Sequence, residues 1–411
     1  WIFSISSRAL NEFSGRGSSK GKTIASAPNS PNNLLSSSDW SAGLVTKILC
    51  PARPNLLEAF DIMMHIPVQK GKIVKAAAFI ILMLSIFATP LRAEPAPTWS
   101  DYMRQQRHQC PGPLAEFSEP RKIQLANKTY THNGYKMMVE NPDADKDVKI
   151  GILGAIKDMS KGTRNNLDAA IKWFKEEGIE WLIANGDISR DEFDLVDAID
   201  YLAKTGLPTL ILPGNIDSAG SFARAYMERS EKYPNLINGM WVRQIAADDI
   251  EFWVVPGYHD KRFMQYSSSC LFKDDDVQVM LETLLPEEEA PLALVSHGPP
   301  RGKGKHALDY IIDGENVGHK GLAQLVKEQE IPFGIYGHIL EAGGRGVLRN
   351  QKTPVKEGKS SKTLHVNAGS MSAFPWVMHN HKASYGLAML MTIKDGKAHY
   401  KTKRFKHQRL D

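Results

Sequence analysis

The sequence of 411 residues lacks several features that would classify a chain at once. It has only three cysteines, and none directly follows the apolar run at residues 76–88, so nothing indicates a lipid anchor there. That run is also too short to span a bilayer comfortably, which takes about 20 residues. The formal net charge is only +5, which by itself implies no nucleic-acid partner. No internal repeat is visible, and the hydrophobic share of 42% is ordinary for a globular protein.

Residues 63–93 have the pattern of a secretory signal peptide. Three lysines between residues 70 and 75 precede the apolar run, and Leu91-Arg92-Ala93 then offers a small-residue cleavage site. A charged start, a short apolar core and a small-residue end are typical of an export signal. We expect an exported protein, periplasmic or secreted, with no transmembrane segment after cleavage. An uncleaved N-terminal anchor is the alternative.

This signal would lie unusually far inside the chain. Residues 1–62 contain no methionine, are rich in Ser, Asn and Gly, and show no sustained hydrophobic period. We interpret them as a non-native leader, with the true start at Met63 or Met64. The alternative is a disordered N-terminal extension. In either case we expect no packed structure there.

Two cysteines remain after the leader and the signal segment, Cys110 and Cys270. In an oxidising compartment a pair of cysteines suggests one disulfide. Two separate buried thiols are the alternative, and the sequence does not decide between them.

The rest of the chain alternates in a way that predicts an α/β fold. Residues 94–147 form a lead-in, with a hairpin expected around the turn His132-Asn133-Gly134-Tyr135. From residue 148, strand, helix, strand, helix and strand follow one another, and after residue 240 strands dominate. The first helix is expected over residues 163–177, with Thr163 as N-cap and Gly178 as its stop. We predict one domain over residues 148–405, with two packed sheets and helices outside, followed by a basic tail at 406–411.

Four loops carry the residues that point to chemistry. Each follows an apolar run that we interpret as a buried strand: Asn185-Gly186-Asp187, Pro213-Gly214-Asn215, Ser296-His297-Gly298 and Tyr336-Gly337-His338. The carboxyl ends of parallel strands are where such sheets bind ligands, and a glycine beside each ligand lets the backbone approach an ion. An Asp, an Asn and two His form a mixed oxygen and nitrogen set that suits Mn, Fe or Zn better than Ca. We therefore predict one divalent metal ion.

The order and contexts of these loops resemble the calcineurin-like metallophosphoesterase family over roughly residues 148–405. That family carries the motifs Asp-x-His, Gly-Asp, Gly-Asn-His-Asp or -Glu, a His beside Gly, and Gly-His-x-His. The resemblance implies a four-layer α/β/β/α sandwich of two mixed sheets with outer helices. It also implies a phosphoester or another anionic small molecule as substrate. It assigns Asp187 as the bridging carboxylate, and Asn215, His297 and His338 as the other ligands of one metal.

This chain departs from the family at one metal site in particular. Ala155-Ile156-Lys157 stands where the first motif should read Asp-x-His, and His338-Ile339-Leu340 stands where the last should read Gly-His-x-His. Ile216 replaces the His that would protonate the leaving group, while Asp217 stays. We therefore expect no second metal and interpret the chain as a degenerate member. Lys157 could occupy the vacated position, compensate Asp187 and hold a phosphate oxygen; the alternative is a solvent-facing lysine.

Further residues complete the candidate site. The predicted catalytic residues are Lys157, Asp217 and His259, and the predicted substrate contacts are Arg301 and Asn215. His259 and His379 are the histidines that could serve as a substitute acid or ligand, although each histidine outside the motifs is more often a surface or packing residue.

Two functional classes remain open at this point. The first is an exported, metal-dependent phosphoesterase with reduced or atypical activity, since a single metal can still activate water. The second is a pseudoenzyme that keeps the fold and one metal to bind a phosphorylated ligand or partner. Turnover that depends on metal and on Asp187 would favour the first, and tight binding without turnover would favour the second.

Overall fold

The computed structural model describes residues 98–117, 119–143, 145–287 and 290–407. All of these residues belong to one compact unit. The expected leader and signal segment therefore lie outside the described residues. Among the described residues, no helix has both the length and the apolar character needed to cross a bilayer.

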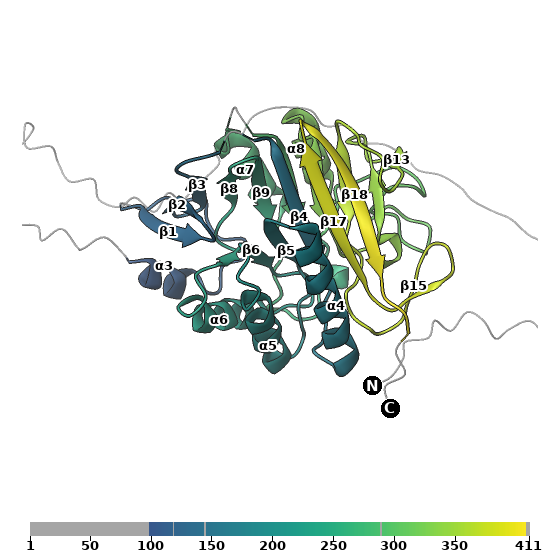
Figure 1. The fold of residues 1–411 in the computed structure, drawn as a ribbon, viewed down its shortest axis with the longest axis horizontal. Coiled ribbons are helices and arrows are strands. Elements are labelled where there is room, and N and C mark those ends of the chain that lie inside the picture. Colours follow the sequence, from purple (N-terminus) through teal and green to yellow (C-terminus); the bar gives the residue numbers. More distant parts are fainter. Residues whose placement is uncertain (1–97, 118, 144, 288–289, 408–411) are drawn as a thin grey trace, which may run out of the picture. The chain divides into compact units, whose positions relative to one another are not determined.

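Two large mixed sheets form the centre of the described unit (Figure 1). The larger sheet has ten strands, which in spatial order are β1 (Arg121–Leu125), β2 (Lys128–Asn133), β3 (Lys136–Val139), β8 (Gln244–Ala247), β9 (Ile250–Val255), β10 (Leu292–Ser296), β11 (Phe333–Tyr336), β14 (Leu364–Asn367), β12 (Arg345–Val347) and β13 (Pro354–Val355). The smaller sheet has six, in the order β18 (Lys397–Arg404), β17 (Leu387–Lys394), β4 (Asp147–Leu153), β5 (Trp181–Asn185), β6 (Thr209–Leu212) and β7 (Leu236–Asn238). A short ribbon pairs β15 (Trp376–Val377) with β16 (Ala383–Ser384).

Both sheets contain a run of four parallel strands. In the smaller sheet β4, β5, β6 and β7 pair in parallel, and β17 is antiparallel to β4. In the larger sheet β9, β10, β11 and β14 pair in parallel, β8 is antiparallel to β9, and β12 is antiparallel to β14 and β13. Parallel strands buried on both faces read as continuous apolar runs, and every residue of β5, β6, β10 and β11 is buried.

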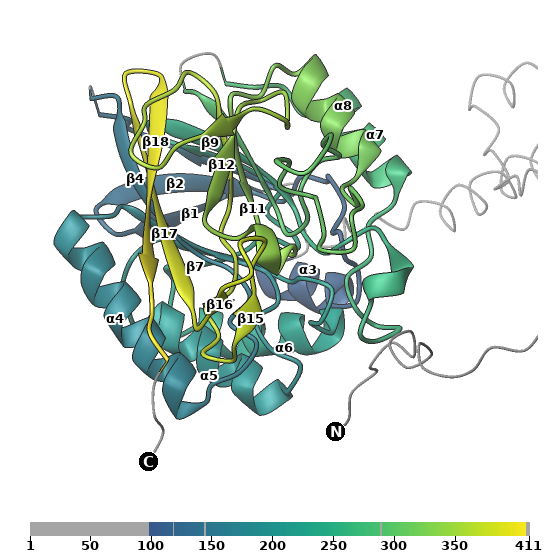
Figure 2. The same ribbon diagram turned by 90° about the vertical axis from the view of Figure 1, so that its right-hand side faces the viewer.

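Helices cover the outer faces of both sheets (Figure 2). One core joins the smaller sheet to α4 (Lys161–Glu177), α5 (Glu192–Ala203) and α6 (Ala219–Ser230), and α3 (Trp99–Gln106) packs against the same core. A second core joins the inner faces of the two sheets, with side chains such as Ile152 and Ile183 from one and Val254 and Val295 from the other. A third joins the larger sheet to α7 (Asp274–Thr283) and α8 (Lys320–Glu328). The predicted four-layer α/β/β/α sandwich of two mixed sheets is therefore confirmed.

The predicted hairpin in the lead-in is confirmed, and it belongs to the larger sheet. β2 and β3 pair across the turn, where Gly134 has a φ of 62°. β3 then pairs in parallel with β8, so that β1 to β3 extend this sheet at one edge.

The first helix of the domain begins earlier than predicted. α4 starts at Lys161, and the hydroxyl of Ser160, three residues before the expected cap, accepts a hydrogen bond from the backbone N–H of Thr163. Thr163 itself is buried, and its hydroxyl donates to Asp158 at 2.9 Å. The predicted stop is right, because Gly178 takes the left-handed conformation with φ 70° and ψ 53°.

The structure pairs Cys110 with Cys270 in a disulfide, with their Cα atoms 5.2 Å apart. The two residues are 160 positions apart in sequence. Cys270 lies on the segment that returns to the end of β9, where its carbonyl accepts a hydrogen bond from the backbone N–H of Tyr258 at 3.0 Å. The bond therefore ties the lead-in to a loop that lies beside the candidate site.

Candidate metal centre

The four predicted ligands meet where the two sheets end. Asp187 and Asn215 follow β5 and β6 of the smaller sheet, and His297 and His338 follow β10 and β11 of the larger one. Because each lies one to three residues beyond a parallel strand, all four loops emerge at the carboxyl edges of the sheets. Asp187, Asn215 and His297 are buried, and His338 is partly buried.

The distances between the donor atoms are short. Nε2 of His297 lies 3.1 Å from Oδ1 of Asp187 and 2.9 Å from Oδ1 of Asn215. Nδ1 of His338 lies 2.7 Å from the same Asn215 oxygen. The Asn215 oxygen therefore lies between the two histidines, and Asp187 joins the group through His297.

The amide of Asn215 is oriented by the backbone. Its Nδ2 donates to the carbonyl of Phe263 at 2.7 Å, so its Oδ1 faces the two histidines. Phe263 closes the short 3-10 helix η1 (Lys261–Phe263), which lies beyond β9.

The contacts of His297 require a proton or a cation at its Nε2 atom. Nδ1 lies 3.0 Å from the carbonyl of Asn185, so this nitrogen carries the proton. Nε2 then faces two oxygens, those of Asp187 and Asn215, and its lone pair is compatible with them only if a proton or a cation stands between. Carboxylate and amide oxygens together with imidazole nitrogens are ligands of Mn, Fe and Zn. The donor set therefore fits a divalent ion.

The electrostatics keep Asp187 and His338 in the forms that bind metal, whereas His297 is held toward its protonated form, so that an ion would have to displace its proton. Burial alone would raise the pKa of Asp187, but His297 and then Lys157 hold it well below its usual range. Burial, reinforced by His297, lowers the pKa of His338 to about 3, so that ring is neutral. Burial also acts to lower the pKa of His297, but Asp187 raises it above its ordinary value. Metal binding requires an ionised carboxylate and neutral imidazoles.

The backbone around this point is strained. Asp187, His338, Lys157 and Ala155 have φ angles of 56°, 60°, 67° and 42°, although none of them is glycine. Such conformations cost roughly 1–3 kcal/mol each and gather at functional sites.

Two glycines make room for the ligands. A Cβ on Gly186 would lie 2.3 Å from Nδ1 of His297, and a Cβ on Gly214 would lie 2.3 Å from Oδ1 of Asp187. These contacts give the Gly-Asp and Gly-Asn pairs their physical reason, because only glycine lets the loops come so close.

Lys157 lies beside the centre rather than out in solvent. Its backbone N–H donates to the carbonyl of Asp187 at 3.0 Å. Its ammonium lies 5.4 Å from the ring centroid of Trp376 and is close enough to Asp187 to lower the pKa of that carboxyl. The residue is half-buried.

Two of the three positions where the resembled family has ligands of its other metal are apolar and buried here, and the third is Lys157. Ala155 is 1% exposed and Leu340 is 4% exposed. Ile216, which stands in place of the expected acid, is also 4% exposed, and its backbone N–H donates to Oδ1 of Asp187 at 3.3 Å. None of these three side chains offers a metal ligand or a proton.

Asp217 joins the loops that carry Asp187 and Asn215. It is fully buried, and its carboxylate accepts hydrogen bonds from the backbone N–H groups of Ile188, Ser189 and Gly214 at 3.2, 2.9 and 2.7 Å. Burial and then Asp187 raise the pKa of Asp217 to about 6. The structure thus places this predicted catalytic residue where it holds the Asp187 and Asn215 loops together.

The other predicted residues lie around the centre but not in it. His259 and Arg301 line a neighbouring cavity of about 480 Å³. Burial and then His319 lower the pKa of His259 to about 4, so it is neutral near pH 7. His379 lines a different cavity, with its Nε2 2.7 Å from the carbonyl of Tyr310.

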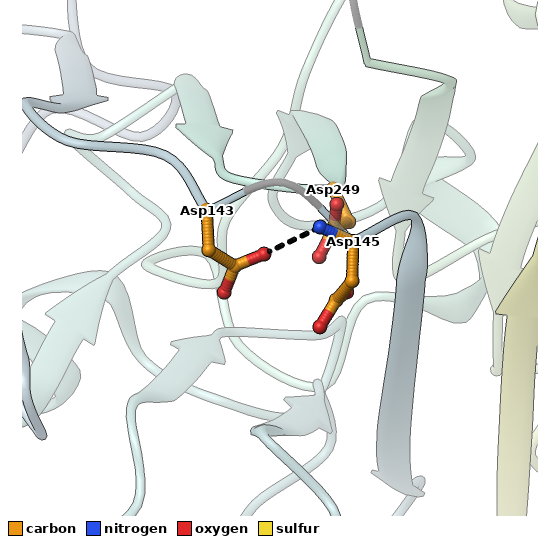
Figure 3. A group of neighbouring side chains, drawn as sticks. All are labelled: Asp143, Asp145 and Asp249. Atoms are coloured by element: carbon orange, nitrogen blue, oxygen red, sulfur yellow. Dashed lines mark hydrogen bonds between the residues drawn. The ribbon is translucent and has the colours of Figure 1, made fainter.

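A separate group of carboxylates lies at the opposite end of the strands (Figure 3). Asp143 and Asp145 come just before β4, and Asp249 comes just before β9. Their ligand atoms lie within 4.8 Å of one another, and the backbone N–H of Asp145 donates to Asp143 at 3.1 Å. Burial, followed by Asp145 and Asp143, raises the pKa of Asp249 to about 7. Asp143 and Asp145 are exposed. At this group of carboxylates, the described residues show no further sign of a bound ion beyond the acidic side chains themselves.

Two residues that shape the site were not predicted. Asn185 donates through Nδ2 to the carbonyls of Ser296 and Ile335 at 3.1 and 3.4 Å, and so joins the ends of β5, β10 and β11. Tyr258 packs its ring on His338 with centroids 3.7 Å apart. The position of Asn185, directly before Gly186-Asp187, could have indicated its role from the sequence. For Tyr258 the sequence offered no indication other than its neighbour His259.

No family model matches the sequence, and no curated protein matches it. Among solved structures, the chain is similar to the protein TT1561 of Thermus thermophilus, with 14% identity and a TM-score of 0.44 over 62% of this chain and 98% of that one. It is also similar to a dimetal phosphatase from Danio rerio, with 11% identity and a TM-score of 0.40 over 64% and 100%. A third is purple acid phosphatase PPD1 from yellow lupin (Lupinus luteus), with 14% identity and a TM-score of 0.37 over 67% and 58%. At these values the similarities assign no function, which has to be argued from the site itself.

Proposed function

We propose that this chain is a metal-dependent phosphoesterase of calcineurin-like type that binds one divalent ion. The observation that carries the proposal is the convergence of Asp187, Asn215, His297 and His338 from four loops of two sheets. Mn, Fe or Zn fits this mixed donor set.

Phosphoester chemistry is supported by what surrounds the four ligands. When bound, a divalent ion supplies Lewis acidity toward a phosphoryl oxygen and lowers the pKa of water. Lys157 adds a fixed positive charge beside Asp187, placed to hold a phosphate oxygen. The order of the motifs along the chain is that of the metallophosphoesterases.

The residues present also imply an unusual reaction profile. Ile216 cannot donate a proton to the departing alcohol, and His259 is neutral at pH 7 and lines a separate cavity. Protonation by a positioned acid contributes about 10²- to 10⁴-fold to such reactions. We therefore propose an enzyme that is slow on alkyl esters and faster on esters with good leaving groups.

Turnover by the purified protein tests this proposal. Metal-loaded protein is assayed with 4-nitrophenyl phosphate and bis(4-nitrophenyl) phosphate, alongside Asp187→Ala and the matched surface variant Asp313→Ala. Loss of turnover in the first variant alone supports the proposal. Equal turnover in all three proteins would assign the activity to a contaminant and reject the proposal.

The apolar residues at the positions of the missing ligands and acid favour a second candidate function, a binding protein without catalysis. Ala155, Ile216 and Leu340 are all buried at positions where a dinuclear enzyme has ligands or an acid. A pseudoenzyme that binds a phosphorylated ligand through one ion and Lys157 would need none of the residues that are missing. Phosphate affinity that depends on Lys157 and on metal, without turnover of any ester, would select this function.

Export forms part of the proposal. The signal-like segment 63–93 and the disulfide between Cys110 and Cys270 both suit an oxidising compartment. Cell fractionation followed by N-terminal sequencing tests this: a mature chain that begins near Glu94 in the periplasm or medium supports export, and an uncleaved chain in the cytosol contradicts it.

A further inference from the structure

A basic cavity adjoins the metal centre and is not explained by metal binding. It measures about 480 Å³, and its lining includes Lys261, Lys273, Arg301 and Lys320. Its one carboxylate, that of Asp274, lies 2.8 Å from Nε2 of His319. Four cationic residues and one acid therefore line this cavity, which gives its lining a net positive charge.

Two neighbouring imidazoles, tilted by 59° relative to each other, form one wall of the cavity. The ring centroids of His259 and His319 lie 4.7 Å apart. Nδ1 of His319 accepts the backbone N–H of Leu322 at 3.2 Å, so both ring nitrogens of His319 have partners. Nδ1 of His259 is buried and has no hydrogen-bond partner in the described protein. Because this atom is itself buried, it offers the cavity no contact, and the cationic lining is what indicates an anionic occupant.

The cavity is rigidly tied to the metal centre by one stretch of chain. Arg301 follows the ligand His297 by four residues, and its backbone N–H donates to the carbonyl of His319 at 2.9 Å. The backbone N–H of His319 in turn donates to the carbonyl of Pro299 at 3.2 Å. Gly318 permits this close approach, because a Cβ there would lie 2.4 Å from the carbonyl oxygen of Pro300.

A second connection runs through an aromatic ring. Tyr258 packs on His338 with centroids 3.7 Å apart, and on His259 with centroids 4.5 Å apart. One ring thus separates a metal ligand from the unpartnered imidazole. The hydroxyl of Tyr258 donates to the carbonyl of Val317 at 3.0 Å, which fixes the ring between the two sites.

We propose that this cavity binds a phosphate group of the substrate other than the one at the metal centre, so that the substrate carries at least two phosphates. The inference rests on the proposed function for the reaction but not for the binding. A phosphate offers several strong acceptors, which match the cationic side chains of the lining. Arg301, predicted from sequence as a substrate contact, belongs to this second position.

Titration with inorganic phosphate tests the cavity separately from catalysis. The experiment uses isothermal calorimetry on chelator-treated full-length protein, so that the metal centre contributes no ion. Arg301→Gln and Lys320→Gln are each expected to weaken phosphate binding by about tenfold, the loss of one charge-assisted contact. Lys175→Gln on α4 is the matched control, and Lys157→Met reports on the other phosphate position.

The outcomes are distinct. Binding that is weakened by Arg301→Gln and Lys320→Gln, but not by Lys157→Met or Lys175→Gln, supports the cavity. Binding that is weakened by Lys157→Met alone, or no phosphate binding at all, overturns it. Circular dichroism shows whether each variant is folded, and His259→Asn gives a second probe of the cavity wall. These results do not depend on turnover, so failure of the proposed hydrolysis would leave them unchanged.

Discussion

Nε2 of His297 lies 3.1 Å from Oδ1 of Asp187, although one residue follows a strand of the larger sheet and the other a strand of the smaller sheet. The packing of the two sheets alone brings this pair together. The metal centre is therefore a property of the sandwich as a whole, and it should respond to changes that loosen either sheet.

The first prediction concerns the missing acid. The variant Ile216→His should increase turnover of esters with poor leaving groups by about 10²-fold, because a positioned acid contributes at least that much. It should change turnover of 4-nitrophenyl phosphate much less, because nitrophenolate leaves without a proton. The measurement is kcat/KM across a series of phenyl and alkyl phosphates, with Ile216→Val as the control. An equal change for all leaving groups would contradict the role assigned to this position.

The second prediction concerns Asp217. Replacement with alanine should lower the free energy of unfolding by at least about 2 kcal/mol, because three buried backbone N–H groups lose their acceptor. Asp217→Asn keeps one acceptor oxygen and should cost less. Urea denaturation followed by circular dichroism measures both. If Asp217→Ala removes activity while stability is unchanged, the residue has a direct catalytic role instead of a structural one.

The third prediction concerns two histidines far from the metal ligands. His132 accepts from Arg121 and lies 2.9 Å from the carbonyl of Gly134, and His365 contacts Tyr336 at 2.8 Å and the carbonyl of Ile331 at 3.3 Å. Burial is the main reason why the pKa of each is lowered to about 3.

These lowered values determine the direction of the pH dependence. The unfolded chain binds protons at these histidines below about pH 6.5, while the folded chain does not until about pH 3. Stability should therefore fall as the pH drops from about 6.5 toward 3, by up to roughly 1.4 kcal/mol per pH unit for each histidine. Urea midpoints at several pH values measure the slope. His365→Leu should reduce it and exposed His306→Gln should not; an unchanged slope in His365→Leu would contradict the account.

The fourth prediction concerns the disulfide. The double variant Cys110→Ala, Cys270→Ala should lose about 2–5 kcal/mol of stability, because the bond closes a loop of 160 residues in the unfolded chain. Its thermal midpoint should also stop depending on added reductant. A wild-type midpoint that does not respond to reductant at all would mean that the two cysteines are not bonded in solution.

Sequence reasoning succeeded where local pattern and packing agree. A buried strand precedes each of the four ligand loops, as predicted, because continuous apolar runs mark strands buried on both faces. By contrast, α6 was not predicted: its residues Ala219–Ser230 begin without a side-chain cap and include Gly220, and the helix is stabilised by burying Phe222 and Tyr226. Tertiary packing overrides weak helix propensity here.

Other parts were missed for different reasons. α3 has a capping box, formed by Thr98 and Asp101, that was readable in the sequence. The orientation of Asn215 was not readable, because it depends on the backbone carbonyl of Phe263, and a carbonyl has no sequence signature. The basic cavity was also hidden, because Arg301 and Lys320 come together only through the pairing of Pro300 with His319.

The most direct test of the central claim is the metal content of the purified protein, measured by elemental analysis without added chelator. The account predicts one divalent ion per chain, and none in a folded His297→Ala variant. Two ions per chain would contradict it by restoring a dinuclear centre, and no ion even after loading with Mn or Zn would reject the metal centre altogether.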